Sequence, residues 1–164
     1  MLRLCRRAQP TGKINLPGIT AFRTYDALCF GPDLPAKPFP TIQIRPGERI
    51  TLPEHGIQIS CEETVFSEFV HSSVTILLFK YGEICGNITL RSRQAGDPIC
   101  LHGVTKRLKK LMIEKKIPAT IRDTIPVVAD GSGLIAVFGL GVASRFLPKP
   151  GDRVLKIEIR EKIV

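Results

Sequence analysis

The sequence predicts an α+β protein, with a small antiparallel β-rich N-terminal part over residues 1–85 and a β-rich α+β domain with one long basic helix over residues 86–164. Three observations favour this class. Apolar and polar residues alternate with the period of a strand in several short runs, such as residues 41–44. Turn signals containing Pro and Gly separate these runs. Apolar residues recur at convincing helical spacing over one stretch, residues 104–117.

The N-terminal part contains a strand candidate at residues 21–30, followed by a proline-rich segment at residues 31–40. Four prolines in that segment exclude a helix or a central strand, so we interpret it as a loop or linker. The first twelve residues are basic and unpatterned, which indicates the remnant of a preceding linker and a chain cut from a longer protein. The further strands expected in this part lie at residues 41–44, 48–52, 57–61 and 75–80.

The C-terminal domain begins with an expected strand at residues 86–93. The predicted helix at residues 104–117 has a possible cap in Thr105 and ends before Pro118. Its buried stripe consists of Val104, Leu108, Leu111 and Met112. A capping box that starts at Thr120 predicts a short second helix. The remaining strands are expected at residues 127–130, 134–138 and 154–159.

Positive charge is concentrated in one part of the chain. The net charge is +9, and residues 91–122 hold 9 Lys and Arg against 2 Asp and Glu, which gives +7. Residues 1–90 carry 9 against 8, and residues 123–164 carry 6 against 5, so each of these parts contributes +1. Such an excess inside an otherwise balanced chain favours a phosphate-backbone partner over a merely solvated surface.

Two groups of cations within this stretch are candidates for phosphate contacts. Strand alternation places Arg91 and Arg93 on one face, where guanidinium groups can fork onto phosphate oxygens or form salt bridges instead. Lys106, Lys109 and Lys110 of the predicted helix lie opposite the apolar stripe, whereas Lys115 falls near the stripe and can snorkel instead. They can meet successive phosphates, or form a solubilising or membrane-surface face. The residues expected to bind the nucleic-acid backbone are Arg91, Arg93, Lys106, Arg107, Lys109, Lys110, Lys115, Lys116 and Arg122.

Other kinds of chemistry find little support in the sequence. The five cysteines are scattered without a C-x-x-C pair, which argues against a disulfide framework or a zinc site and favours reduced thiols in the cytoplasm. Gly139-Leu140-Gly141 lacks the rest of a phosphate-binding loop and is interpreted as a turn. No apolar run approaches the roughly 20 residues that span a bilayer, so we expect no membrane partner. No catalytic set of residues is visible.

The order of several short motifs resembles the C-terminal domain of tRNA(Ile)-lysidine synthases. The matching motifs are Leu90-Arg91-Ser92-Arg93-Gln94-Ala95-Gly96-Asp97, Thr105-Lys106-Arg107-Leu108-Lys109-Lys110-Leu111, Ile117-Pro118, Arg122-Asp123, Ile125-Pro126-Val127-Val128 and Gly139-Leu140-Gly141-Val142. Upstream, Leu16-Pro17-Gly18 and Tyr25-Asp26-Ala27-Leu28-Cys29-Phe30 resemble the segment that precedes this domain. The sequence departs from the family pattern at Pro98, Val104 and Met112.

The resemblance implies a fold similar to a domain of the phenylalanyl-tRNA synthetase β chain. It implies an ATP-dependent ligase that attaches lysine to C2 of the wobble cytidine of an isoleucine tRNA. ATP and Mg would belong to an N-terminal domain whose SGGxDS phosphate loop is absent here, so this part is expected to hold no cofactor, metal or catalytic residue.

Within that resemblance, residues 86–164 would form the tRNA-binding domain, which grips the tRNA toward its acceptor stem, and residues 1–85 a linker or substrate-binding region. The resemblance is also compatible with a homodimer. The alternatives are a protein-interaction or membrane-surface module that uses the basic helix against an acidic partner, and an independent enzyme with an unrecognised site.

Overall fold

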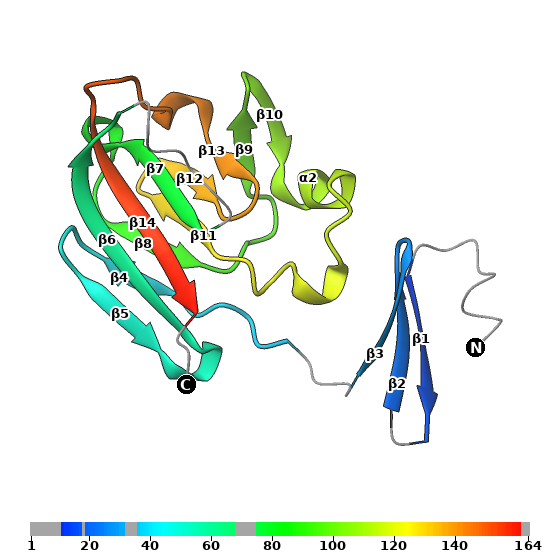
Figure 1. The fold of residues 1–164 in the computed structure, drawn as a ribbon. Coiled ribbons are helices and arrows are strands. Elements are labelled where there is room, and N and C mark those ends of the chain that lie inside the picture. The colour runs from blue at the N-terminus through cyan, green and yellow to red at the C-terminus, as the bar shows by residue number, and fades with distance from the viewer. Residues whose placement is uncertain (1–10, 18, 32–35, 68–74, 162–164) are drawn as a thin grey trace.

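A computed structural model describes residues 11–17, 19–31, 36–67 and 75–161 of the chain. Figure 1 shows a small three-stranded sheet set to one side of a larger body of paired sheets. Residues 36–41, which lead into the larger body, have no regular structure, in agreement with their proline content. Cys5 and His71 lie outside the described residues.

The small sheet is an antiparallel meander of order β1-β2-β3. Its strands are β1 (Thr11–Leu16), β2 (Ile19–Thr24) and β3 (Ala27–Gly31). The single strand expected at residues 21–30 is therefore wrong, because the chain reverses at Tyr25 and Asp26. Tyr25 has a φ of +50°, a left-handed conformation that suits a two-residue hairpin turn.

A five-stranded sheet of order β13-β12-β11-β8-β4 forms one layer of the larger body. Its strands are β4 (Ile42–Ile44), β8 (Ile88–Arg91), β11 (Val127–Asp130), β12 (Gly133–Val137) and β13 (Gly141–Val142). Strands β11 and β12 lie at the strands expected at residues 127–130 and 134–138, and they pair as an antiparallel hairpin. At its turn, Ser132 donates from its backbone N–H and from its hydroxyl to the Asp130 carboxylate, both at 2.7 Å.

A four-stranded sheet of order β5-β6-β14-β7 forms the other layer. Its strands are β5 (Arg49–Leu52), β6 (Ile57–Val65), β7 (Ile76–Lys80) and β14 (Arg153–Glu161). In register, β14 pairs Arg153 with Val65 at one end and Glu161 with Ile57 at the other. Strands from residues 1–85 thus pair with strands from residues 86–164 in both sheets of the larger body.

One hydrophobic core joins the two layers. Ile59, Phe79 and Ile157 from the four-stranded sheet and Leu90 and Ile135 from the five-stranded sheet are fully buried. Each such side chain stabilises the fold by about 1.5–3 kcal/mol relative to an exposed one. The described part of the chain also contains short 3₁₀ turns at Pro53–His55 (η1), Tyr81–Glu83 (η2), Ala119–Ile121 (η3) and Ser144–Phe146 (η4).

The predicted long helix at residues 104–117 is wrong. Its first four residues form strand β10 (Val104–Arg107), which pairs with β9 (Pro98–Leu101), and helix α2 covers only Leu108–Glu114. The cause is the turn at His102 and Gly103, which both have a positive φ, as the two-residue turns of hairpins require. The β-branched residues that follow favour a strand.

The caps expected from the sequence are absent as well. Arg107 occupies the N-cap position of α2, and no side chain caps it. Thr120 lies inside the 3₁₀ turn η3, whose N-cap position is Pro118, so the predicted capping box does not form. None of the described helices is long and apolar enough to cross a membrane.

Candidate nucleic-acid interface

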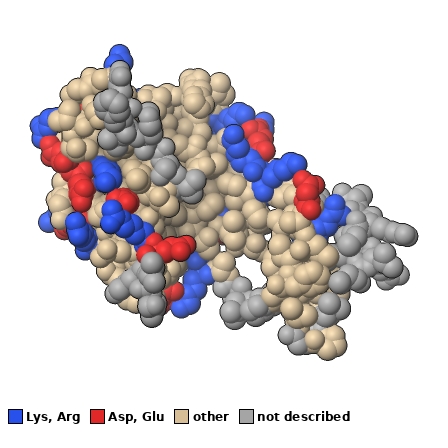
Figure 2. Space-filling model, in the orientation of Figure 1, with Lys and Arg blue, Asp and Glu red and all other residues tan. Residues whose placement is uncertain are grey.

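Lysine and arginine side chains gather over the region of α2 (Figure 2). Four of them are exposed and form no ion pair or hydrogen bond through their side chains with any residue that the structure describes. We call Arg107, Lys109, Lys110 and Lys115 the α2 cation cluster. They lie within nine consecutive residues and provide positive groups that can accept an anionic ligand without first losing a partner.

The short helix explains why these cations face the solvent. Leu108, Leu111 and Met112 recur at spacings of three and four residues, so they share one helix face and are buried in the core. Lys109 and Lys110 occupy the intervening positions and are exposed. The predicted division of α2 into a buried stripe and a basic face is confirmed for the seven residues that are helical.

Lys106 lies in β10 rather than in the helix. Its Nζ is 2.6 Å from Oε2 of Glu114, at the end of α2. The hydrogen bond from Lys106 lowers the pKa of the Glu114 carboxyl and, together with the positive charges of Lys106, Lys110 and Lys115, outweighs the opposing effect of burial. Glu114 is therefore an acid held in a positive field beside the α2 cation cluster.

Arg91 is the last residue of β8 and is engaged inside the protein. Its Nη1 and Nη2 donate to Oδ2 and Oδ1 of Asp97 at 2.9 and 3.1 Å, and the two side chains are only 14% and 11% exposed. Burial acts to raise the pKa of Asp97. The hydrogen bonds from Arg91 and from the Gln94 N–H, with the charges of Arg91 and Arg93, outweigh it, so the pKa is lowered.

The Arg91–Asp97 pair also positions α2. The Asp97 backbone oxygen accepts a hydrogen bond of 2.8 Å from the N–H of Leu108, the first residue of the helix. Arg91 thus fixes Asp97, and Asp97 fixes the start of the helix that carries the cations. Of the two roles that the sequence allows for Arg91, the structure shows the salt bridge.

Arg93 does not share a strand face with Arg91, because β8 ends at Arg91. Its Nε lies 3.0 Å from Oδ1 of Asp123, but the alignment is too poor for a hydrogen bond, and that nitrogen is buried without a hydrogen-bond partner among the described residues. The side chain is 21% exposed. Arg93 therefore lies at the edge of the surface, with its charge balanced by a carboxylate.

Arg122 and Lys116 contact the turn of the small sheet. Arg122 is 8% exposed, and its Nε donates to the Ile117 carbonyl at 2.9 Å while its Nη2 donates to the Tyr25 hydroxyl at 3.2 Å. Lys116 lies 3.2 Å from Oδ2 of Asp26, and both side chains are largely exposed. The β2–β3 turn therefore meets the larger body next to the α2 cation cluster, a role that the sequence analysis missed for Tyr25 and Asp26.

The nine predicted cations thus fall into two groups. The cluster of four is exposed and free of partners in the described structure, whereas Arg91, Arg93, Lys106 and Lys116 pair with carboxylates and Arg122 is buried. Among the described residues, no three His, Cys, Asp or Glu side chains are grouped so that they could hold a metal ion.

The comparisons with known proteins assign the larger body to a class of C-terminal domains. Residues 88–159 match the family model described as "TilS substrate C-terminal domain". A solved structure described as "Crystal structure of TILS C-terminal domain" superposes with a TM-score of 0.64, covers 76% of this chain and 98% of that chain, and is 23% identical, so it shows the shared fold.

The curated relatives share one name, tRNA(Ile)-lysidine synthase. The chain is 32% identical over 147 residues to the tRNA(Ile)-lysidine synthase of Bacillus thuringiensis subsp. konkukian, covering 82% of this chain and 29% of the relative. It is 31% identical over 146 residues to that of Geobacillus kaustophilus, covering 82% of this chain and 30% of the relative. The matched stretch belongs to the TilS C-terminal domain family, and the chain corresponds to the C-terminal region of tRNA(Ile)-lysidine synthases. It spans less than a third of these curated relatives.

Proposed function

We propose that this chain is the tRNA-binding part of a tRNA(Ile)-lysidine synthase and that the α2 cation cluster contacts the tRNA backbone. The observation that carries the proposal is the exposure on one short segment, inside a region of net charge +7, of four cations that have no partner among the described residues. Phosphate contacts of this kind fix position and orientation without reading bases. Such contacts suit a domain that positions a tRNA for a catalytic site in another domain.

The paired cations have a supporting role in this proposal. Arg91 and Arg93 shape the loop before α2, and Arg122 and Lys116 orient the small sheet beside the cluster. Lys106 and Lys116 are exposed enough for a phosphate to compete with their carboxylate partners. We therefore keep both as peripheral phosphate contacts and assign Arg91, Arg93 and Arg122 to positioning.

The whole protein is proposed to ligate lysine to C2 of the wobble cytidine of an isoleucine tRNA in the cytoplasm, with ATP. The proposal rests on the name of the relatives and on the motifs quoted above. ATP and Mg would bind in an N-terminal domain, because the SGGxDS loop is not part of this sequence. This part would hold the acceptor-stem side of the tRNA, and it supplies no catalytic residue in the proposal.

Further parts of the proposal concern fold and assembly. The paired β layers would be similar to a domain of the phenylalanyl-tRNA synthetase β chain. Residues 1–85 would include the link to the catalytic domain, and two copies of the whole protein would form a homodimer. The small sheet, which meets the larger body through Tyr25 and Asp26, supports the linking role.

A matched pair of charge reversals tests the proposed surface. Lys109→Glu lies in the cluster, whereas Lys149→Glu makes the same charge change at another exposed position, outside the cluster. We expect Lys109→Glu to weaken isoleucine tRNA binding roughly tenfold and Lys149→Glu to change it less than about twofold. Equal losses of tRNA affinity in the two variants would show only an effect of net charge and would contradict the proposal that the α2 cation cluster contacts the tRNA. Binding to anionic vesicles in preference to tRNA would favour the membrane-surface alternative.

A further inference from the structure

Two hollows flank the 3₁₀ turn η2, which follows β7 and lies away from α2. Tyr81 and Gly82 of that turn line both of them. The first has a volume of about 380 Å³ and the second about 420 Å³. Both volumes are within the range of about 300–1,000 Å³ that is typical of small-molecule sites, so the chemistry of the walls decides what each can bind.

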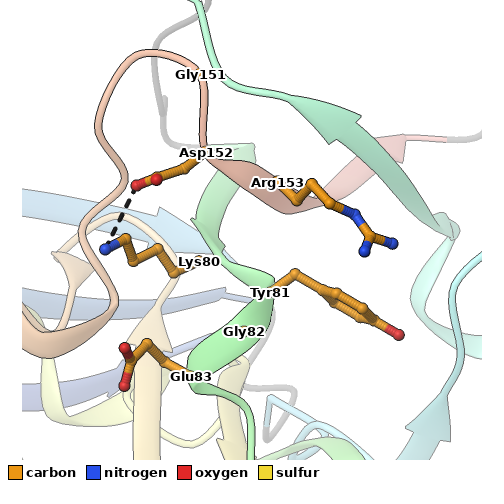
Figure 3. Close-up of a pocket in the computed structure, with 7 residues that line it drawn as sticks. All are labelled: Lys80, Tyr81, Gly82, Glu83, Gly151, Asp152 and Arg153. Carbon is orange, nitrogen blue, oxygen red and sulfur yellow. Dashed lines mark ion pairs between the residues drawn. The ribbon is translucent and has the colours of Figure 1, made fainter.

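The first hollow is occupied by charge pairs of the protein itself (Figure 3). Nζ of Lys80 points toward Asp152 at 3.5 Å, and Arg153 pairs with Glu63 while its guanidinium lies 5.3 Å from the centre of the Tyr81 ring. The walls hold two cations and two acids, so they offer no net charge to a ligand. This hollow is therefore poorly suited to an anion.

The second hollow has the opposite character. Its apolar wall consists of Pro46, Tyr81 and Ile84, whereas Ile44 and Ile88 border the hollow but are almost fully buried in the core, at 2% and 5% exposure. Its charged lining residue is Arg45, and Asn87 adds an amide. In the described structure, neither the Arg45 guanidinium nor the Asn87 amide has a hydrogen-bond or ion-pair partner. No acid lines this hollow.

This combination suits a nucleotide. A base is flat and apolar on its faces and carries hydrogen-bonding groups on its edge, and aromatic side chains stack on such faces whatever the base. An amide can both donate to and accept from a base edge, and a guanidinium can fork onto a phosphate. Arg153, which lies over the Tyr81 ring, lines only the first hollow, and the cation that lines the second is Arg45.

We propose that the hollow lined by Tyr81, Arg45 and Asn87 binds one nucleotide, with the base against the apolar wall and the phosphate at the Arg45 guanidinium. The occupant is an unpaired nucleotide of an RNA strand, a choice that rests on the proposed function, in which the chain binds a tRNA, and on the open position of the hollow at the surface. A free mononucleotide offers the same chemistry and is the other source to be tested. This site goes beyond the phosphate contacts assigned to the α2 cation cluster.

Tyrosine fluorescence of the full chain tests the inference. The chain has two tyrosines and no tryptophan, so Tyr25→Phe leaves Tyr81 as the only strong fluorophore. We expect a short single-stranded RNA to quench Tyr81 at a lower concentration than AMP does. Quenching by AMP at equal or lower concentration would overturn the RNA-strand source, and the absence of quenching by both would overturn the nucleotide site.

A matched pair of arginine variants makes the test independent of Tyr81. Arg45 lines the hollow, whereas Arg49 is four residues away and pairs with Glu62. Arg45→Ala should weaken binding of the short RNA roughly fivefold, the scale of a charge-assisted contact, while Arg49→Ala leaves it unchanged. Equal binding by both variants would overturn the inference. Lys109→Glu affects the proposed backbone contacts instead, so failure of one proposal is distinguishable from failure of the other.

Discussion

Arg91 and Asp97 join the end of β8 to the loop before β9 through two parallel hydrogen bonds between largely buried side chains. The same Asp97 accepts from the N–H of Gln94 through its carboxylate and from the N–H of Leu108 through its backbone oxygen. One carboxylate residue therefore connects a central strand, a tight loop and the first turn of α2. The negative charge of Asp97 is neutralised by Arg91 inside the protein, so this residue stabilises the surface that carries α2 and does not bind a partner molecule.

The first prediction concerns the stability that this pair provides. Asp97→Ala leaves the Arg91 guanidinium largely buried without its partner, so we expect a loss of about 2–3 kcal/mol in the free energy of unfolding, measured by urea denaturation. Glu54→Ala removes an exposed pair with Lys37 and should have no measurable effect. Equal stability of the two variants would contradict the structural role of Asp97.

The second prediction concerns the effect of acidic pH on the stability that Asp97 provides. The pKa of Asp97 in the folded chain lies below its ordinary value of 3.8, so its contribution to stability is complete above that value and is lost as the pH falls through the lowered folded pKa. The stability difference between the wild type and Asp97→Asn should therefore be constant near neutral pH and shrink below about pH 4. Urea denaturation at a series of pH values measures it. A difference that grows on acidification would show that the pKa is raised instead.

The third prediction concerns salt. If the four cations of the α2 cluster neutralise phosphates, the logarithm of the tRNA binding constant should fall with the logarithm of salt concentration at a slope of about −3 to −4. Lys109→Gln combined with Lys110→Gln should reduce the steepness by about 2, as measured by titrations over a range of salt concentrations. Lys37→Gln, at an exposed position outside the cluster, should leave the slope unchanged. A slope near zero in the unmodified chain would remove the phosphate-contact argument.

The fourth prediction concerns the acid next to the cluster. Glu114→Gln removes a negative charge from the surface and frees Lys106, so tRNA affinity should rise by roughly threefold at low salt. Glu54→Gln makes the same change in net charge away from α2 and serves as the control. Filter binding or fluorescence anisotropy can compare the two. A fall in affinity for Glu114→Gln would mean that the carboxylate holds Lys106 in its binding position.

Some strands could be predicted from the sequence because one of their faces packs on the core and the other is less buried, whereas β11 and β12 are buried on both faces and form continuous apolar runs. The alternation in residues 57–61 and 154–159 reflects this directly, and those runs lie in β6 and β14. The sequence pattern overestimates the length of the helix. Val104 belongs to strand β10, but it lies four residues before Leu108 and so continues the helical spacing of apolar residues by coincidence. The turn at His102 and Gly103, which starts β10, carries weaker signals than the apolar stripe.

The candidate site was predictable in its location but not in its details. The charge excess of residues 91–122 includes the α2 cation cluster. The sequence contains no sign of which cations are engaged, because the partners of Arg93 and Lys116 come from distant parts of the chain. Only Asp97, six residues after Arg91, was close enough to be suspected.

The central place of β14 has a consequence for how the protein is made. This strand pairs on both edges, with β6 and β7, yet it is separated from β6 by roughly 90 residues. A ribosome must therefore synthesise almost the entire described chain before the four-stranded layer can close. Until then the inner edges of β6 and β7 lack their partner and can pair with other chains, so recombinant yield should depend on conditions that slow aggregation of the nascent polypeptide.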